Sequence, residues 1–122
     1  MTSESEFPLD QAIDFEPFTV KADESLKNVV TLLSKTKASC VLIVEQQKLI
    51  GIYTERDVVR MAANRQKFDG LDVADVMSKN IVSVTASQIS DIFVVLNLMR
   101  RHRIRHLPVL NEHQQLVCII TP

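Results

Sequence analysis

The fold is decided by residues 40–54, CVLIVEQQKLIGIYT. The first five residues are apolar and rich in β-branched types, as expected of a strand that is covered on both faces. A polar connector, EQQK, then leads into a second apolar run, which suggests a hairpin. Upstream, Leu26, Val29, Val30 and Leu33 recur at helical spacing, so one stripe of a helix faces a core. These segments predict a small sheet with a helix packed on it.

The same order of segments occurs twice in the chain. Residues 18–54 contain FTV, LKNVVTLLSK, CVLIV, EQQK and LIGIY, and residues 82–121 contain VSV, ISDIFVVLNLMRR, HLPVL, NEHQ and LVCII. The offset between the copies drifts from 64 residues at Val20/Val84 to 67 at Thr54/Thr121, which small loop insertions explain. Because neither copy alone buries its apolar face well, the repeat predicts two similar units that pack against each other.

Composition limits the classes of function. The chain has 122 residues, of which 46% are hydrophobic and 24% charged, with a formal net charge of -1, so it has no general attraction to nucleic acids or anionic membranes. Its longest apolar stretch, residues 92–99, is too short to span a bilayer, and the N-terminus does not resemble a secretory signal. Cys40 and Cys118 lie in apolar runs and lack zinc-ligand spacing. We therefore expect a cytoplasmic protein without a bound metal.

The chain is expected to divide into four parts. Residues 1–15 read as a polar leader, residues 16–65 as the first repeat, residues 66–80 as a linker and residues 81–122 as the second repeat, which lacks a final helix. Val73, Val76 and Met77 are apolar at helical spacing, so part of the linker is expected to dock on the protein. Apolar side chains surround most of the helix predicted near residues 92–99, which indicates either a central core helix or a contact with a partner chain.

The segment GIYTERD, residues 51–57, ends a predicted strand and begins a helix. At a helix N-terminus, Thr54 can bind a phosphate together with the free backbone N–H groups. Asp57 can accept hydrogen bonds from both hydroxyls of a ribose, and Gly51 leaves room for a ligand beside the strand. The same threonine and aspartate also fit a capping box, and both roles can hold together.

The motif GIYTERD resembles the nucleotide-binding signature of the CBS (cystathionine β-synthase) domain family. HLPV at 106–109 and DVMS at 75–78 resemble two other motifs of that family, and the resemblance covers nearly everything after residue 15. It implies a tandem CBS pair, a Bateman-type module similar to the N-terminal regulatory regions of bacterial signalling proteins. The implied fold is α/β (α+β): two repeats, each a small mixed sheet with helices, packed with pseudo-two-fold symmetry.

The resemblance also implies which residues bind a ligand. In the family, the threonine and aspartate of one repeat face strand residues of the other, so the implied contacts are Gly51, Thr54, Arg56, Asp57, Ile81, Val82, Ile104, Arg105 and His106. A second, weaker cleft would use Ala38, Ser39, Cys40 and Thr121. It is weaker because Leu42 replaces the usual proline, Cys118 replaces the usual glycine, and no acid follows Thr121 at the third position.

A strongly basic segment covers residues 100–106. Its arginines and histidines either form a solvated helix end or recognise phosphate; the absence of interleaved aromatic residues argues against nucleic-acid binding. No enzyme is expected, because neither cysteine has an evident histidine base and no serine lies in a nucleophile elbow.

The sequence thus predicts a regulatory module without catalytic residues or a required cofactor. AMP, ADP, ATP or S-adenosylmethionine would bind between the repeats and control a C-terminal output domain, with a homodimer as the expected assembly. The alternative is a dimerisation or tethering module that binds no ligand.

Overall fold

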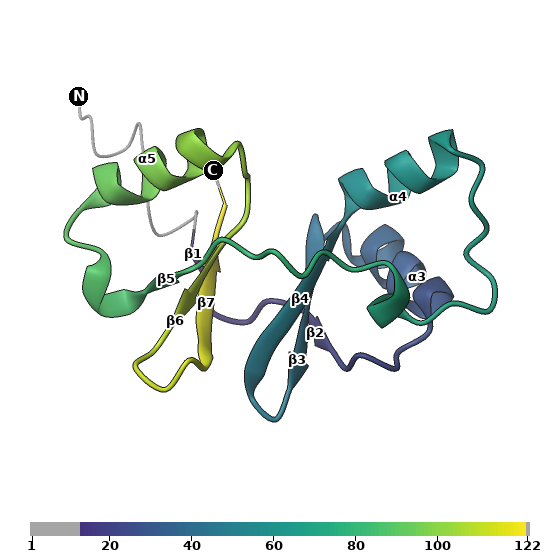
Figure 1. The fold of residues 1–122 in the computed structure, drawn as a ribbon, viewed down its shortest axis with the longest axis horizontal. Coiled ribbons are helices and arrows are strands. Elements are labelled where there is room, and N and C mark those ends of the chain that lie inside the picture. The colour runs from purple at the N-terminus through teal and green to yellow at the C-terminus, as the bar shows by residue number, and fades with distance from the viewer. Residues whose placement is uncertain (1–12, 122) are drawn as a thin grey trace. The chain divides into compact units, whose positions relative to one another are not determined.

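The computed structural model describes residues 13–121, so most of the predicted leader and Pro122 lie outside the described residues. The described chain forms two compact units (Figure 1). The first unit comprises Phe18–Ile81, and the second unit comprises residues 13–17 together with residues 82–121.

The first unit contains a three-stranded sheet and two α-helices. Its elements are β2 (Thr19–Val20), α3 (Leu26–Thr36), β3 (Cys40–Glu45), β4 (Lys48–Thr54), α4 (Glu55–Ala63) and the 3-10 turn η1 (Val73–Asp75). The strand order is β2-β3-β4. β2 runs parallel to β3, whereas β3 and β4 form an antiparallel hairpin. The predicted hairpin and the helix that precedes it are confirmed.

The second unit repeats this arrangement. Its elements are β1 (Ile13–Asp14), β5 (Val84–Thr85), the 3-10 turn η2 (Ala86–Gln88), α5 (Ile92–His102), β6 (Leu107–Leu110) and β7 (Leu116–Ile120). The strand order is β1-β7-β6-β5, in which β5 runs parallel to β6 and β6 antiparallel to β7. Both repeats are therefore small mixed sheets with helices, as predicted.

Side-chain caps set the helix boundaries. α3 begins after Ser25, whose Oγ accepts the backbone N–H of Asn28 at 3.1 Å. α5 begins after Asp91, whose Oδ1 accepts the N–H groups of Phe93 and Val94. These bonds satisfy donors that have no partner within the helix. The cap at Asp91 explains why α5 starts at Ile92 although the apolar segment in the sequence begins at Ile89.

Each unit has its own hydrophobic core. The core of the first unit consists of Leu26, Val29, Leu33, Val41, Ile43, Tyr53, Met61 and Val73. The core of the second unit consists of Val84, Val95, Met99, Leu107, Val109, Cys118 and Ile120. In β3 the residues 40–43 are all buried, which confirms the prediction of a strand that is covered on both faces. Val73 lies in the predicted linker, and its complete burial anchors that segment to the first unit.

Two short segments pair with the outer strands of the hairpins. In the first unit Ser78 and Ile52 exchange two backbone hydrogen bonds of 2.9 and 3.0 Å. In the second unit β1 pairs with β7, with Ile13 opposite Ile120. The sequence analysis placed Ile13 in the leader and Ser78 in the linker, and the structure has each of them at the edge of a sheet.

The helix α5 buries one apolar stripe. Val95 and Met99 contribute to the core of the second unit, whereas Phe93 is 68% exposed and Leu96 38% exposed. The core interpretation therefore accounts for only part of this helix. Among the described residues no helix is both long and apolar enough to cross a bilayer.

Candidate ligand-binding site

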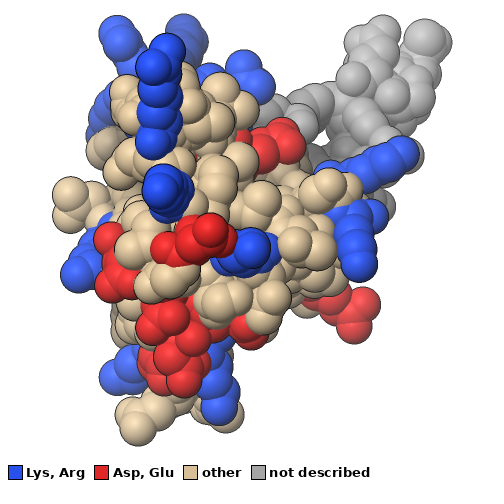
Figure 2. Space-filling model, turned by 90° about the vertical axis from the view of Figure 1, so that its right-hand side faces the viewer, with Lys and Arg blue, Asp and Glu red and all other residues tan. Residues whose placement is uncertain are grey.

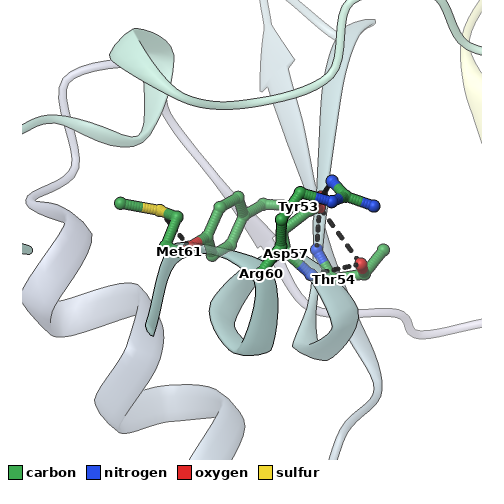
Figure 3. Close-up of polar contacts among 5 residues, drawn as sticks. All are labelled: Tyr53, Thr54, Asp57, Arg60 and Met61. Atoms are coloured by element: carbon green, nitrogen blue, oxygen red, sulfur yellow. Dashed lines mark hydrogen bonds and ion pairs between the residues drawn. The ribbon is translucent and has the colours of Figure 1, made fainter. Parts of the chain in front are cut away.

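The candidate site lies where β4 passes into α4 (Figure 3). Thr54 is the last residue of β4, and its extended backbone, with φ -121° and ψ 165°, makes it the N-cap of α4. Its Oγ1 accepts the backbone N–H of Asp57 at 3.2 Å. The motif therefore begins a helix by satisfying one of its orphan donors, as the capping interpretation predicted.

The carboxylate of Asp57 completes this cap. Its Oδ2 accepts the backbone N–H of Thr54 at 2.9 Å and the hydroxyl of Thr54 at 3.1 Å. Its Oδ1 accepts NH1 of Arg60 at 2.9 Å. Figure 3 shows Asp57 between Thr54 and Arg60, with dashed lines for these contacts. Because 19% of the Asp57 side chain remains exposed, the carboxylate can still be reached by a ligand.

Tyr53 forms a fully buried support next to the motif. Its hydroxyl donates to Sδ of Met61 at 3.1 Å. Burial, and secondarily the negative charge of Asp57, raises the pKa of Tyr53 to about 12. The tyrosine is therefore neutral at physiological pH, and its ring fixes α4 against the sheet.

The space beside Gly51 is filled by a side chain of the same unit. A Cβ at Gly51 would meet Sδ of Met77 and would lie 2.8 Å from its Cγ. The sequence analysis assigned this space to a ligand. In the structure the glycine permits Met77 of the linker to pack directly on β4, and the contact of Gly51 with a ligand stays a prediction.

Residues at the start of β3 lie next to Thr54. Cys40 and Thr54 are Cα partners across the hairpin, and the carbonyl of Ser39 accepts the N–H of Glu55 at 3.0 Å. The structure thus brings Ser39 and Cys40, which the sequence analysis assigned to a second cleft, beside the threonine of the main motif.

The other predicted contacts fall in both units. Arg56 is exposed in the first turn of α4, and Ile81 ends the first unit. The second unit contains Val82, Ile104, Arg105, His106 and Thr121. Of the basic segment, residues 100–102 form the last turn of α5, where positive charge complements the helix dipole. No helix follows β7 within residues 82–121.

Two contacts near the motif were not predicted from the sequence. Arg60 pairs with Asp57, and the spacing Asp-x-x-Arg on a helix is a signal that could have indicated this contact. Met77 contacts the Gly51 position from a segment far away in sequence, and no local pattern indicates that contact.

The outer face of the first unit offers a separate groove and mixed charge. Figure 2 shows acidic and basic side chains interspersed on this side, without a continuous basic surface. A groove of about 430 Å³ lies between α3 and residues 67–69, and Lys27 and Asp69 form an exposed ion pair of 3.1 Å at it. No residue of the predicted site lines this groove.

Metal binding and thiol chemistry have no evident basis in the described part of the chain. Residues 13–121 contain no group of three or more ligating side chains that could hold a metal ion. Cys40 and Cys118 are both buried and unbridged, and burial, together with the charge of Asp14, raises the pKa of Cys118. A raised pKa makes a thiol a poorer nucleophile at neutral pH.

Comparison with known families identifies the repeat. The model of the CBS domain matches residues 11–64 and again residues 73–122. This chain belongs to the CBS domain family. Because the two matches cover both repeats, the protein contains a tandem pair of CBS domains.

Solved structures of CBS proteins share this fold. The CBS domain pair of protein MJ0100, in complex with 5-methylthioadenosine and S-adenosyl-L-methionine, is 22% identical with a TM-score of 0.77, over 93% of this chain and 91% of that one. A CBS domain protein of Pyrobaculum aerophilum, complexed with AMP, is 24% identical with a TM-score of 0.73, over 86% of this chain and 79% of that one. Related CBS structures thus hold adenosyl compounds.

The curated relatives are longer proteins. An inosine-5'-monophosphate dehydrogenase of Nitrosopumilus maritimus is 28% identical over 106 residues, which are 86% of this chain and 21% of that protein. The chain spans between 21% and 37% of the length of the first curated relatives that it matches. The likeness therefore concerns the CBS region and not the activity of those proteins as a whole.

Proposed function

We propose that this CBS pair is a regulatory module that senses an adenine nucleotide or a similar adenosyl ligand. The observation that carries the proposal is the partly exposed pair of Thr54 and Asp57 at the N-terminus of α4, which offers a hydroxyl and a carboxylate next to each other. The solved CBS structures with AMP and with S-adenosyl-L-methionine support the choice of ligand class.

The local chemistry suits a ribose better than a phosphate. Glu55 and Asp57 already place two acids in the first turn of α4, and the N–H groups of both residues are bonded within the unit. These acids complement the positive end of the helix dipole and would repel a phosphate. We therefore assign the ribose hydroxyls to Asp57. Any phosphate is assigned to basic residues of the predicted site, Arg56, Arg105 and His106.

A ligand panel tests the proposal directly. We expect AMP, ADP, ATP, 5'-methylthioadenosine or S-adenosylmethionine to raise the melting temperature, because a ligand at about 100 times its Kd stabilises the folded state by about 2.7 kcal/mol. The variant Asp57→Ala is expected to reduce the shift, because the proposed acceptor of the ribose hydroxyls is lost.

The matched control is Asp75→Ala. Asp75 accepts the N–H of Asp72 at 2.8 Å, a capping contact like that of Asp57, but it lies outside the predicted site. It is expected to keep the ligand-induced shift. An equal loss in both variants would mean that the effect of Asp57 is structural.

The module is proposed to act by binding and not by catalysis. A ligand that favours one of two conformations by about 1 to 3 kcal/mol is sufficient to control an attached output domain. The curated relatives, of which this chain spans only a part, are consistent with such an arrangement. The absence of any thermal shift across the panel would argue against this function.

A second candidate function is a dimerisation or tethering module without a ligand. The exposed Phe93 and Leu96 on α5 favour it, because an apolar surface on a helix is typical of a protein contact. Both this alternative and the proposed homodimer predict that Phe93→Ser converts a dimer into a monomer. Light scattering measures this change. A wild-type protein that is monomeric at high concentration would rule out this use of α5.

A further inference from the structure

The carboxylate of Asp57 has little capacity left for a ligand. A carboxylate offers about four acceptor positions, two on each oxygen. The backbone N–H and the hydroxyl of Thr54 occupy both positions of Oδ2. Arg60 occupies one position of Oδ1, at 2.9 Å (Figure 3). One position therefore remains, whereas a ribose presents two neighbouring hydroxyls.

The contact with Arg60 can be given up without damage to the fold. Of the two bonds to Oδ2, the one from the backbone N–H of Thr54 belongs to the capping box of α4, so losing it would break the box. The side chain of Arg60 is instead 61% exposed and lies one turn further along the same helix. It can rotate into solvent without leaving a buried group unsatisfied.

We propose that Arg60 is a specificity-determining residue that competes with the ribose hydroxyls of an adenosyl ligand for Oδ1 of Asp57. This inference rests on the proposed function. The guanidinium holds Oδ1 in the ligand-free protein, and a ligand with both hydroxyls displaces it. Arg60 thereby lowers the affinity for ribose-containing ligands. It also narrows the difference in affinity between these ligands and ligands that lack the two hydroxyls.

The energetics set the size of the effect. Exposed ion pairs between residues one helical turn apart are weak, and removing such a competitor is expected to strengthen binding by about two- to fivefold. Salt screens exposed pairs, so the gain should shrink at high ionic strength.

Titration calorimetry with AMP and 2',3'-dideoxy-AMP tests the competition. The two ligands carry the same phosphate, so the ratio of their Kd values reports the ribose hydroxyls and cancels the charge that is lost with an arginine. Arg60→Met is expected to raise the preference for AMP by about two- to fivefold. Arg60→Lys, which retains a cationic donor, is expected to keep the preference of the wild type.

A double-mutant cycle separates competition from a structural role. In the background of Asp57→Ala, the change Arg60→Met should no longer alter the ratio of the two Kd values, because the contested acceptor is gone. If the preference of Arg60→Met for AMP over 2',3'-dideoxy-AMP were equal to or smaller than that of the wild type, the competition would be overturned. The result would show that Arg60 supports Asp57. If the folded wild type binds neither ligand and no member of the panel shifts its melting temperature, the proposed nucleotide-sensing function itself fails, a result distinct from binding without a change in ratio.

Discussion

Tyr53 couples the binding motif to the core of the first unit. It precedes Thr54 directly, its ring is fully buried, and its hydroxyl reaches Met61, the buried residue of α4. The negative charge of Asp57 lies close enough to disfavour the phenolate. Any movement of α4 on ligand binding would therefore change the surroundings of this one phenol.

The raised pKa of Tyr53 predicts a loss of stability at alkaline pH. The unfolded chain releases the phenolic proton near pH 10 and the folded chain near pH 12, so the stabilisation is complete below pH 10 and is lost as the pH rises toward 12. A shift of this size corresponds to roughly 2 to 3 kcal/mol of unfolding free energy. The difference in unfolding free energy between the wild type and Tyr53→Phe should fall by about that amount across this interval.

The pKa of Tyr53 can be measured directly by absorbance, because Tyr53 is the only tyrosine of the chain. The phenolate absorbance of the folded protein then reports a single group. Asp57→Asn should lower the midpoint, since the charge of Asp57 is the second cause of the shift. A midpoint near pH 10 in the folded wild type would contradict the burial argument.

At the level of single residues, the sequence predicted the contact between Thr54 and Asp57 but not the one between Asp57 and Arg60. Thr54 and Asp57 are three residues apart, and their capping geometry follows from that spacing. Met77 could not be placed beside Gly51 in this way, because its position depends on how the linker returns to β4. The assignment of Gly51 to a ligand stays a prediction.

At the level of elements, the hairpin of β3 and β4 contains a turn that its residues do not favour. Glu45 and Lys48 are paired across it, and both central residues have positive φ, 52° at Gln46 and 69° at Gln47. Two-residue turns of this kind match the twist of the strands but usually contain asparagine or glycine. The apolar runs on either side, and not the turn, must therefore set the register.

Replacing Gln46 with glycine should stabilise the first unit. Glycine adopts positive φ without the Cβ clash, and after its larger loss of chain entropy the net gain is expected to be about 0.5 to 1 kcal/mol in chemical denaturation. Gln66→Gly is the matched control, because Gln66 is exposed but is not among the residues with positive φ. A similar gain in both variants would show that the turn is not strained.

The long elements were predictable because their hydrophobic periods are clear. The helix α3 and the strands β3 and β4 fall within a residue or two of the segments quoted from the sequence. The two-residue strand β1 was not predicted, since a segment of that length has no period to detect. Its partner β7 lies near the other end of the chain, so the pairing depends on the fold and not on local sequence.

At the level of the whole molecule, the segment that precedes each repeat pairs with the sheet of the other repeat. The segment around Ser78 precedes the second repeat but pairs with β4, and β1 precedes the first repeat but pairs with β7. Each unit has its own core and one buried cysteine, Cys40 in the first and Cys118 in the second. Thiol labelling can therefore follow the opening of each unit separately.

Disrupting the edge pairing of one sheet should open only the unit that contains that sheet. Ile13 packs on the core of the second unit, so Ile13→Asp is expected to speed labelling of Cys118 by about tenfold, for a cost near 1.4 kcal/mol, and to leave Cys40 unchanged. Ser78→Pro removes the N–H that donates to Ile52 and should instead speed labelling of Cys40. Mass spectrometry of each cysteine peptide gives both rates in one sample. If either variant accelerated both cysteines equally, the two CBS repeats would unfold as one cooperative body, which would contradict separate opening of the units.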